Sequence, residues 1–487
     1  MRPDSRFLPP AAFALAALLL SGCKMAPTYS TPVIDVPAQY RQSGLWREAQ
    51  PAAPDAVPEA WWTLFNDPDL NRLQDGAAIG NQTLAATVAQ LRVAQAALDS
   101  SRAPLLPTLG VNAGATRSRT GGASSGTVDS AGNVVGSTGG RPRNLVTLQG
   151  SASWEIDLWG RLSSAVDAAS ARAQASVDDL AAARLSLQAS VVQTYFALRT
   201  ADAQRIVLDD TLLGYERSLA LTRNRYAAGV ASAADVSQAE AQLYSTRAQR
   251  MEAVASRAQL EHALAALLGQ APASFSLPET GLLPEAPAVP PALPATLLQR
   301  RPDIAAAERR VAAANAQIGV ARSAFFPALT LSSNAGYRSS SLNDIVSAPN
   351  LFWSIGPALA LSVFDNGLRR AAVDSATFAT DQAAANYRQT VLTALQEVED
   401  NLVLAAVLQD ELVVQQQALT SARKALDVAD NQYRAGIVNY LNVVTAQATV
   451  LSAQRSLLDV RNRRLVAVGV LLKNLGGAWG GTTLPPR

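Results

Sequence analysis

The stretch Asn224–Val230, of sequence NRYAAGV, has a close copy 207 residues later in Asn431–Ile437, of sequence NQYRAGI. Each copy separates two long Ala-rich runs of helical character. The glycines in these copies, Gly229 and Gly436, can adopt the left-handed backbone conformation that ends a helix, which other residues adopt only at a cost. The repeated stretch therefore predicts a tight turn in each half of an internally duplicated protein.

A polar residue follows each turn glycine after three positions. Ser232 follows the first glycine and Asn439 the second, and both residue types favour the N-cap position of a helix. We therefore predict that each turn is the tip of a helical hairpin, at about residues 226–236 and 433–443.

The composition narrows the possible functions. Net charge is +2 and only 16% of the 487 residues are charged, so there is no basic footprint for nucleic acid. A single Cys and a single His argue against a disulfide, a Cys-based metal site and imidazole chemistry. No nucleophile–base pair can be assembled from the motifs, and we expect the protein not to be an enzyme.

The N-terminus has the pattern of a processing signal. Arg2 and Arg6 precede the apolar run Ala11–Leu20, which is too short for a mature transmembrane helix. The small residues before Cys23 resemble a bacterial lipobox, in which cleavage leaves that Cys as an acylated, palmitate-bearing N-terminus. The alternative is an ordinary signal peptide with an incidental Cys. Lys24, in place of Asp, favours sorting to the outer membrane by resemblance to sorted lipoproteins.

The hydrophobic period changes to two in four segments. Asn144–Leu158 and Phe352–Phe364 alternate apolar and polar residues, and weaker partners lie at about 107–117 and 328–338. Their lengths match tilted transmembrane β-strands. A soluble sandwich edge is the alternative, since alternation alone does not distinguish lipid from a protein core.

Two very long helical runs follow the strand pairs. They extend from Gly160 to about 228 and from Gly367 to about 435, without an internal Pro. Shorter helices are expected at 81–103, 231–268, 302–323 and 439–475. Each repeat therefore consists of one long helix packed on two shorter helices placed end to end.

The repeats give the predicted division of the chain. It comprises a signal peptide at 1–22, a lipidated extended segment at 23–66, repeat 1 at 67–277 with strands at about 107–117 and 144–158, a Pro-rich linker at 278–294, repeat 2 at 295–475 with strands at about 328–338 and 352–364, and a tail at 476–487.

Four strands cannot close a barrel, and lipid does not tolerate open sheet edges. Chains must therefore share a barrel. Two copies would form a barrel of eight strands, whose interior is filled by side chains. Three copies would form a barrel of twelve strands, which leaves room for a channel. The polar strand faces would then line water.

Several motifs resemble one family. They are Cys23–Tyr29 (CKMAPTY), Arg300–Glu308 (RRPDIAAAE), Ile318–Pro327 (IGVARSAFFP) and the two Tyr-x-x-Gly turns. Together they resemble the TolC-like outer-membrane factor family, and within it the OprM/NodT-type lipoproteins of resistance-nodulation-division (RND) efflux pumps.

The resemblance implies a mainly α-helical homotrimer with a twelve-stranded transmembrane β-barrel and a periplasmic α-barrel. It also implies a periplasmic adaptor protein and an inner-membrane RND transporter as partners, no cofactor beyond the lipid on Cys23 and contact with outer-membrane lipid. The expected role is passive export of drugs or other small molecules, hence multidrug resistance. The alternatives are an exit duct for type I protein secretion and a non-channel periplasmic coiled-coil lipoprotein.

The resemblance also suggests a gate at the hairpin tips. By position, Tyr433 and Asp235 resemble a gate-locking pair, in which a phenol donates a charge-assisted hydrogen bond. The alternative is that Asp235 only completes a capping box with Ser232. The family's acidic ring falls on Asn442 and Thr445, so we expect weaker cation trapping here. His262 is expected at the surface or in a groove. For Arg300 and Arg301, solvent and a carboxylate are both open as surroundings, and the family motif suggests a structural anchor at the repeat junction. Packing or an interface belt is expected for Trp154, Trp159 and Trp353.

Overall fold

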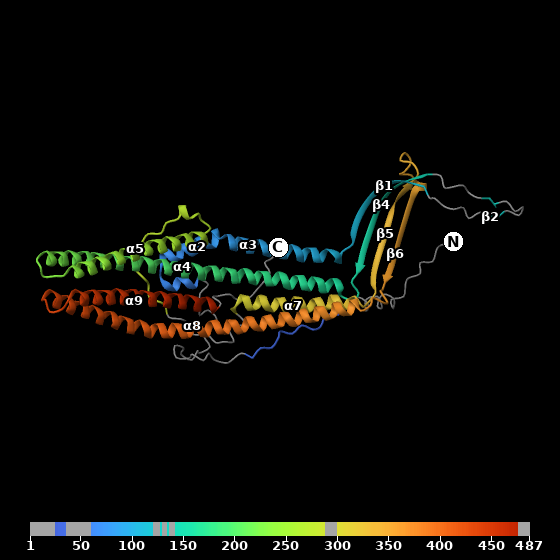
Figure 1. The fold of residues 1–487 in the computed structure, drawn as a ribbon. Coiled ribbons are helices and arrows are strands. Elements are labelled where there is room, and N and C mark those ends of the chain that lie inside the picture. Colours follow the sequence, from blue (N-terminus) through green and yellow to red (C-terminus); the bar gives the residue numbers. More distant parts are fainter. Residues whose placement is uncertain are drawn as a thin grey trace. The chain divides into compact units, whose positions relative to one another are not determined.

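The computed structural model describes residues 25–35, 60–119, 127–128, 134–135, 142–287 and 300–475 (Figure 1). The predicted signal peptide at 1–22, the lipidation residue Cys23 and the tail at 476–487 lie outside the described residues.

The described residues form two compact units. The first unit contains the strands and the helix ends that adjoin them, and it lies within residues 25–31, 93–173 and 309–384. The second unit contains the other helical residues. Each unit combines parts of both sequence repeats, so the repeats and the compact units divide the chain in different ways.

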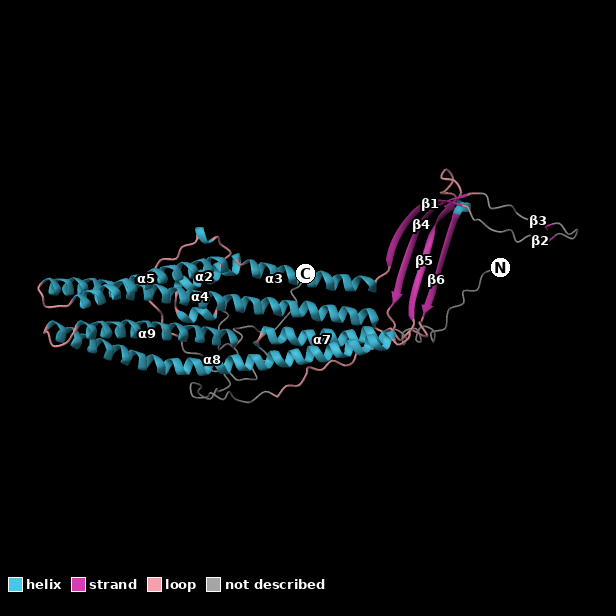
Figure 2. Ribbon diagram, viewed as in Figure 1, coloured by secondary structure: helices cyan, strands magenta, loops and turns pink. Residues whose placement is uncertain are grey.

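The first unit is built on a four-stranded antiparallel sheet (Figure 2). The strands, in their spatial order, are β1 (Thr108–Ser118), β4 (Arg143–Ile156), β5 (Ala328–Ser339) and β6 (Leu351–Ala360). A small hairpin of β2 (Thr127–Val128) and β3 (Val134–Val135) lies in the first connection. All four predicted strands are thus confirmed, and β1 and β6 form the two edges of the sheet.

The second and fourth strands end earlier than predicted. β4 ends at Ile156 because Asp157 caps the following helix, accepting bonds from the backbone N–H groups of Leu162 at 3.1 Å and Ser163 at 2.7 Å. β6 ends at Ala360, and Asp365 similarly accepts from the N–H of Gly367 at 3.1 Å. A side chain that caps a helix requires a turn before that helix, and the turn takes the last predicted strand residues out of the sheet.

The sheet has one mainly apolar and one mainly polar face. Strand partners point to the same side, and the register pairs Trp154 with Leu331 and Ala335 with Trp353. The next position on each strand faces the other way, where Ser151 pairs with Asn334, which in turn pairs with Ser354. The register therefore confirms the predicted alternation across all four strands.

The N-terminal segment packs on the helix ends in this unit. Asn315, on α7 (Pro302–Ser323), donates from Nδ2 to the carbonyl of Pro27 at 2.9 Å. A Cβ at Gly319 would lie only 2.7 Å from both the Ala26 Cβ and the Ser164 Oγ. Only glycine leaves room for the segment at this point.

The remaining helices confirm the predicted pattern. They are α2 (Pro68–Gly80), α3 (Gln82–Arg102), α4 (Arg161–Ala227), α5 (Ala233–Leu267), α8 (Leu368–Arg434) and α9 (Tyr440–Asn474), with 3₁₀ turns at Trp61–Phe65, Ala103–Leu105, Pro272–Ser274 and Ala348–Asn350. α4 and α8 have 67 residues each, which gives each a length of about 100 Å. No helix within the described part of the chain is both long enough and apolar enough to cross a membrane.

The short helices of each repeat meet at their ends in the second unit. Asn81, just before α3, donates from Nδ2 to the carbonyl of Leu267 at the end of α5 at 2.8 Å, and its Oδ1 accepts from the N–H of Leu84 at 2.8 Å. In the second repeat, Asp303 lies at the start of α7 and Lys473 at the end of α9, and the positive charge of Lys473 helps to lower the pKa of Asp303. The predicted end-to-end placement is thus confirmed.

Arg301 anchors the start of α7, as the motif suggested. Its guanidinium donates to Asp303 at 2.6 Å and to Glu397 of α8 at 3.0 Å. Burial alone would raise the pKa of Asp303, but the hydrogen bonds and charge of Arg301 hold that pKa below its usual range. The contact therefore contributes stability at neutral pH that is lost as the pH falls through the lowered pKa.

The core of the second unit brings together distant parts of the chain. Trp61, Phe65, Phe196, Leu264 and Leu472 are all at most 2% exposed and belong to one apolar cluster. The cluster joins the segment before α2 to helices of both repeats. The hydrophobic effect of burying these side chains therefore holds the two hairpins together.

A buried charge network reinforces this core. Arg199, only 1% exposed, donates from Nη2 to Asp69 at 2.8 Å and from Nη1 to the carbonyl of Pro278 at 2.6 Å. Asp202, fully buried, accepts from Arg199 at 3.3 Å and from Arg257 of α5 at 2.7 Å. The network thus ties α2, α4, α5 and the segment after α5 into one body.

Replacing Arg199 with Met should lower the free energy of unfolding by about 3 kcal/mol. The change leaves the Pro278 carbonyl without its donor and the buried Asp202 with Arg257 as its remaining cationic partner. Arg72→Met is the matched control, since Arg72 also pairs with Asp69 but its side chain is 72% exposed; it should cost at most about 1 kcal/mol. Denaturant titration of the detergent-solubilised protein measures both. Equal losses in the two variants would contradict a stabilising role for the buried network.

Candidate functional site at the hairpin tips

The two tip turns have the same backbone geometry. Gly229 has φ +74° and Gly436 has φ +77°. In the first turn the N–H of Gly229 donates to the Tyr226 carbonyl at 2.9 Å and that of Val230 to the Arg225 carbonyl at 2.8 Å; the second turn repeats both bonds. This pair of bonds is the Schellman motif, which requires a left-handed residue after the helix. The prediction made from the glycines is confirmed.

The helix starts after the turns differ between the repeats. Ser232 and Asp235 form a complete capping box: the Asp235 N–H donates to the Ser232 Oγ at 3.2 Å, and the Ser232 N–H donates to the Asp235 Oδ2 at 2.9 Å. Asn439 occupies the N-cap position of α9, but its side chain makes no capping hydrogen bond. The prediction of side-chain capping is therefore wrong for Asn439, whose third following residue, Asn442, has no carboxylate to complete a box.

The contacts between the repeats at the tips involve Arg225, Ser218 and Tyr440, which were not among the residues singled out from the sequence. Arg225, at the end of α4, donates from Nη1 to the carbonyls of Tyr433 at 3.1 Å and Arg434 at 3.4 Å, and its guanidinium lies 4.6 Å from the centre of the Tyr433 ring. The hydroxyls of Ser218 and Tyr440 lie 3.0 Å apart and form a second bond between the repeats. A cation at the C-terminal carbonyls of a helix is electrostatically favourable, so Arg225 stabilises the contact between the two tips.

Tyr433 and Asp235 are not joined as the resemblance suggested. Among the described residues, the Tyr433 hydroxyl has no hydrogen-bond partner, although Tyr433 is only 5% exposed. The Asp235 carboxylate accepts from the backbone and side chain of Ser232 instead. The alternative prediction, a capping box, is therefore confirmed and the direct bond to Tyr433 is wrong, because the nearby N-cap satisfies the carboxylate locally. A gating role for either residue stays a prediction.

The centre of the tip is an apolar and aromatic cluster. Tyr440, 2% exposed, packs against Tyr433 with ring centres 5.3 Å apart, and Tyr215, Leu243 and Val443 complete the contact. Burial raises the pKa of Tyr440, and the negative charge of Asp235 raises it further. The phenol is thus neutral at physiological pH and is a hydrogen-bonding group, not an acid.

The two residues at the family's acidic-ring positions lie at the surface. Asn442 and Thr445 are both exposed, and the Thr445 hydroxyl donates to the carbonyl of Leu441 on its own helix at 2.9 Å. Neither brings a charge to the tip, and the expected weakening of cation trapping stays a prediction.

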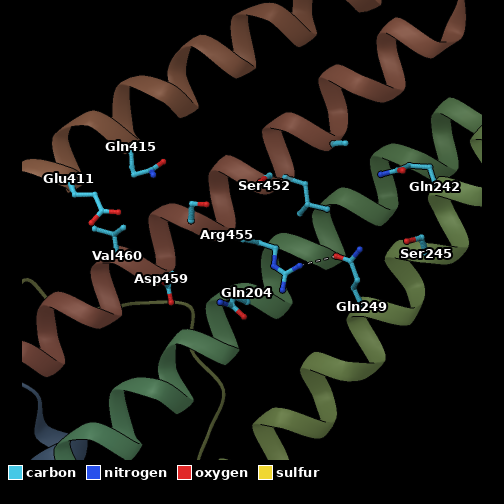
Figure 3. A pocket seen from close by; sticks show the side chains of 13 residues that line it. Gln204, Gln242, Ser245, Gln249, Glu411, Gln415, Ser452, Arg455, Asp459 and Val460 are labelled. Atoms are coloured by element: carbon cyan, nitrogen blue, oxygen red, sulfur yellow. Dashed lines mark hydrogen bonds between the residues drawn. The ribbon is translucent and has the colours of Figure 1, made fainter. Parts of the chain in front are cut away.

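A polar groove of about 650 Å³ lies between the hairpins behind the tip (Figure 3). Side chains of α4, α5, α8 and α9 line it, among them Gln242, Gln415 and Ser452. Arg455 donates to Gln249 across it at 3.0 Å. Amide and hydroxyl side chains predominate in its lining, together with the charged side chains of Glu411, Arg455 and Asp459. The groove suits contact with water and polar solutes.

The other residues considered from sequence have structural surroundings. His262 is exposed, as expected. Trp159 donates from Nε1 to the carbonyl of Pro327 at 2.8 Å and stacks on Phe326 at 4.7 Å, so it packs at a strand–helix junction. Trp353 is 73% exposed on the apolar sheet face, which leaves the interface-belt interpretation open. No cluster that could hold a metal ion is present among the described residues.

Two long helical hairpins joined to a sheet with one apolar and one polar face define the class of outer-membrane channel proteins. The family model described as "Outer membrane efflux protein" matches residues 73–270 and 293–477. The chain therefore belongs to the outer membrane efflux protein family, and it is an outer-membrane efflux channel of a Gram-negative bacterium.

Individual relatives agree with this assignment. The chain is 32% identical over 467 residues to the probable efflux pump outer membrane protein TtgC of Pseudomonas putida, a match that covers 96% of this chain and 95% of TtgC. It is 34% identical over 468 residues to the outer membrane protein OprJ of Pseudomonas aeruginosa, with the same coverage of both chains. The solved structure of the outer-membrane channel OprN has a TM-score of 0.84 and 30% identity, covering 94% of this chain and all of that one.

Replacing Arg225 with Ala should raise the single-channel conductance in planar bilayers several-fold, because it removes both carbonyl contacts and the ring contact that connect the tips. Arg223→Ala is the matched control: Arg223 lies two residues away but pairs with Glu240 inside the first hairpin, at 2.6 Å. The control should conduct like the parent. Equal conductance of the parent and Arg225→Ala would show that this contact does not keep the tip closed. A higher conductance of Tyr433→Phe would instead favour closure through the Tyr433 hydroxyl.

Proposed function

We propose that three copies of the chain close one barrel and form a passive conduit through the outer membrane. The observation that carries this proposal is the sheet with two unpaired edges, β1 and β6, and one apolar face. Backbone groups in lipid must be hydrogen-bonded, and three sheets of four strands supply a ring of twelve with space inside. The polar faces would then line the water-filled passage.

The conduit would be the last component of a tripartite pump. A periplasmic adaptor protein and an inner-membrane RND transporter would deliver drugs or other small molecules to the hairpin tips. The names of TtgC and OprJ support this role, since they describe efflux and outer-membrane proteins. The Arg225 contacts support a tip that closes between transport events, and the chain itself would perform no chemistry on its cargo.

Lipid exposure of the apolar face can be tested in cells that lack the native gene. Ile355, 63% exposed on the apolar face of β6, and its neighbour Ser354 on the polar face give a matched pair. Ile355→Lys should fail to restore dye efflux, because a lysine in the bilayer interior costs about 2–4 kcal/mol in each copy. Ser354→Lys should restore it. Equal loss in both, or activity in Ile355→Lys, would contradict the proposed placement of the two faces.

We also propose a covalent lipid on Cys23. The segment that follows this residue supports the idea, because Ala26 and Pro27 are fixed on α7, next to the junction of strands and helices. A lipid attached a few residues earlier would therefore lie near the membrane surface. Such a chain adds about 0.8 kcal/mol of membrane affinity for each buried methylene group.

Metabolic labelling with radioactive palmitate should mark the wild-type protein and leave Cys23→Ser unlabelled. The sequence has one Cys, so no other thiol can take up label. Labelling of Cys23→Ser equal to that of the parent would refute lipidation at this position.

A further inference from the structure

The charges of the sheet are few and unevenly placed. Its four long strands contain only four charged residues: Arg117, Arg143, Glu155 and Arg338. The three arginines lie at the end where the strands are connected to one another, and Glu155 lies at the end where the helices begin. In an outer-membrane channel whose helices extend into the periplasm, the arginine end opens to the exterior.

The register assigns the arginines to different faces. Arg338 pairs with Thr147, and Arg143 pairs with Ser118, so both lie on the polar face. Arg117 pairs with Asn144 and lies on the opposite, apolar face. Two of the three external arginines therefore belong to the face that would line the passage.

The single acid of the sheet is already neutralised. Arg161 donates two hydrogen bonds to the Glu155 carboxylate, from Nε to Oε1 at 2.9 Å and from Nη2 to Oε2 at 2.7 Å. The loop between β5 and β6 contributes one further acid, Asp344. The external end of the polar face thus keeps an excess of positive charge.

Arg338 is held in place by an aromatic ring. Its guanidinium lies 4.8 Å from the ring centre of Phe352 on the neighbouring strand, within the range of a cation–π contact. Arg338 remains exposed, so the in-plane N–H groups are available. A fixed planar guanidinium is well suited to bind carboxylate, phosphate or sulfonate groups.

We propose that Arg338, supported by Phe352 and joined by Arg143, forms an anion-attracting ring at the external end of the passage. This inference rests on the proposed conduit, in which the polar faces line water. Each copy contributes two cations, so the ring favours the exit of solutes that carry an anionic group and slows that of cationic ones.

The rates at which charged reagents label a nearby cysteine report the electrostatic potential at this ring. Asn334→Cys places a thiol on the polar face of β5, directly opposite Ser354 of β6 and four residues before Arg338. Negatively charged, positively charged and neutral methanethiosulfonates are added to intact cells, so access comes from outside and does not depend on the tips. The chain without Asn334→Cys gives the background of the one native Cys.

The ratio of anionic to cationic labelling rates should fall at least about threefold in Arg338→Gln/Arg143→Gln at low salt. Arg338 lies four residues from the thiol, about 13 Å along the strand, which is within the screening length of about 30 Å at 0.01 M salt. The ratio should be retained in Arg338→Lys and in Arg117→Gln, the matched control on the other face. The difference should shrink in 1 M salt. An unchanged ratio in the double variant, or an equal fall in Arg117→Gln, would overturn the proposal.

The same experiment separates this proposal from the conduit on which it rests. If Asn334→Cys reacts with none of the three reagents, the polar face does not line water, and the conduit itself fails. If it reacts with the neutral reagent at the parental rate but the charge preference does not depend on Arg338, only the anion-attracting ring fails. Neutral-reagent rates also show that each variant is folded and inserted.

Discussion

The edges of a four-stranded sheet are the constraint on which the molecule depends. β1 and β6 are each paired on one side only, and the sheet presents an apolar face. An apolar face favours lipid, whereas an unpaired backbone edge in lipid costs several kcal/mol for each group. One chain cannot satisfy both demands alone. Pairing between copies resolves the conflict, and a hollow ring follows from the number of strands.

The two repeats share a backbone plan but use different side chains at corresponding points. Gly229 and Gly436 make the same turn with the same bonds. In contrast, Asn81 starts one short helix by binding a helix end, whereas Arg301 starts the corresponding helix through two carboxylates. This divergence makes contacts between the repeats specific. Arg225 of the first tip contacts carbonyl groups of the second. The second repeat has Gln432 at the corresponding position and not an arginine.

Local pattern was sufficient to predict most of the fold. A left-handed glycine, a long run without proline and an alternation of period two each fix the backbone through neighbours in sequence. The turns, the 67-residue helices and all four strands were therefore predictable. One error occurred where a side chain had a choice of partner, because Asn439 leaves its helix start uncapped. For Asp235 the sequence left two partners open, and the structure confirms the capping box with Ser232 in place of a bond to Tyr433.

The tip contacts could not be predicted in the same way. Ser218 and Tyr440 are 222 residues apart, and Arg225 and Tyr433 are 208 apart. Such pairs depend on the angle at which two hairpins pack, which no local period encodes. A partial signal was present, because Arg225 lies inside the repeated stretch where the second copy has Gln432. A charged residue at one of two equivalent positions indicates a role that the duplication alone does not explain.

The sharing of one barrel among copies can be measured directly by the mass of the purified protein in detergent. Light scattering that separates protein from detergent mass should give three times the 51.0 kDa chain, less any processed N-terminus. The same mass should persist on dilution, since the sheet edges remain paired. A stable, folded species with the mass of one chain would contradict the account.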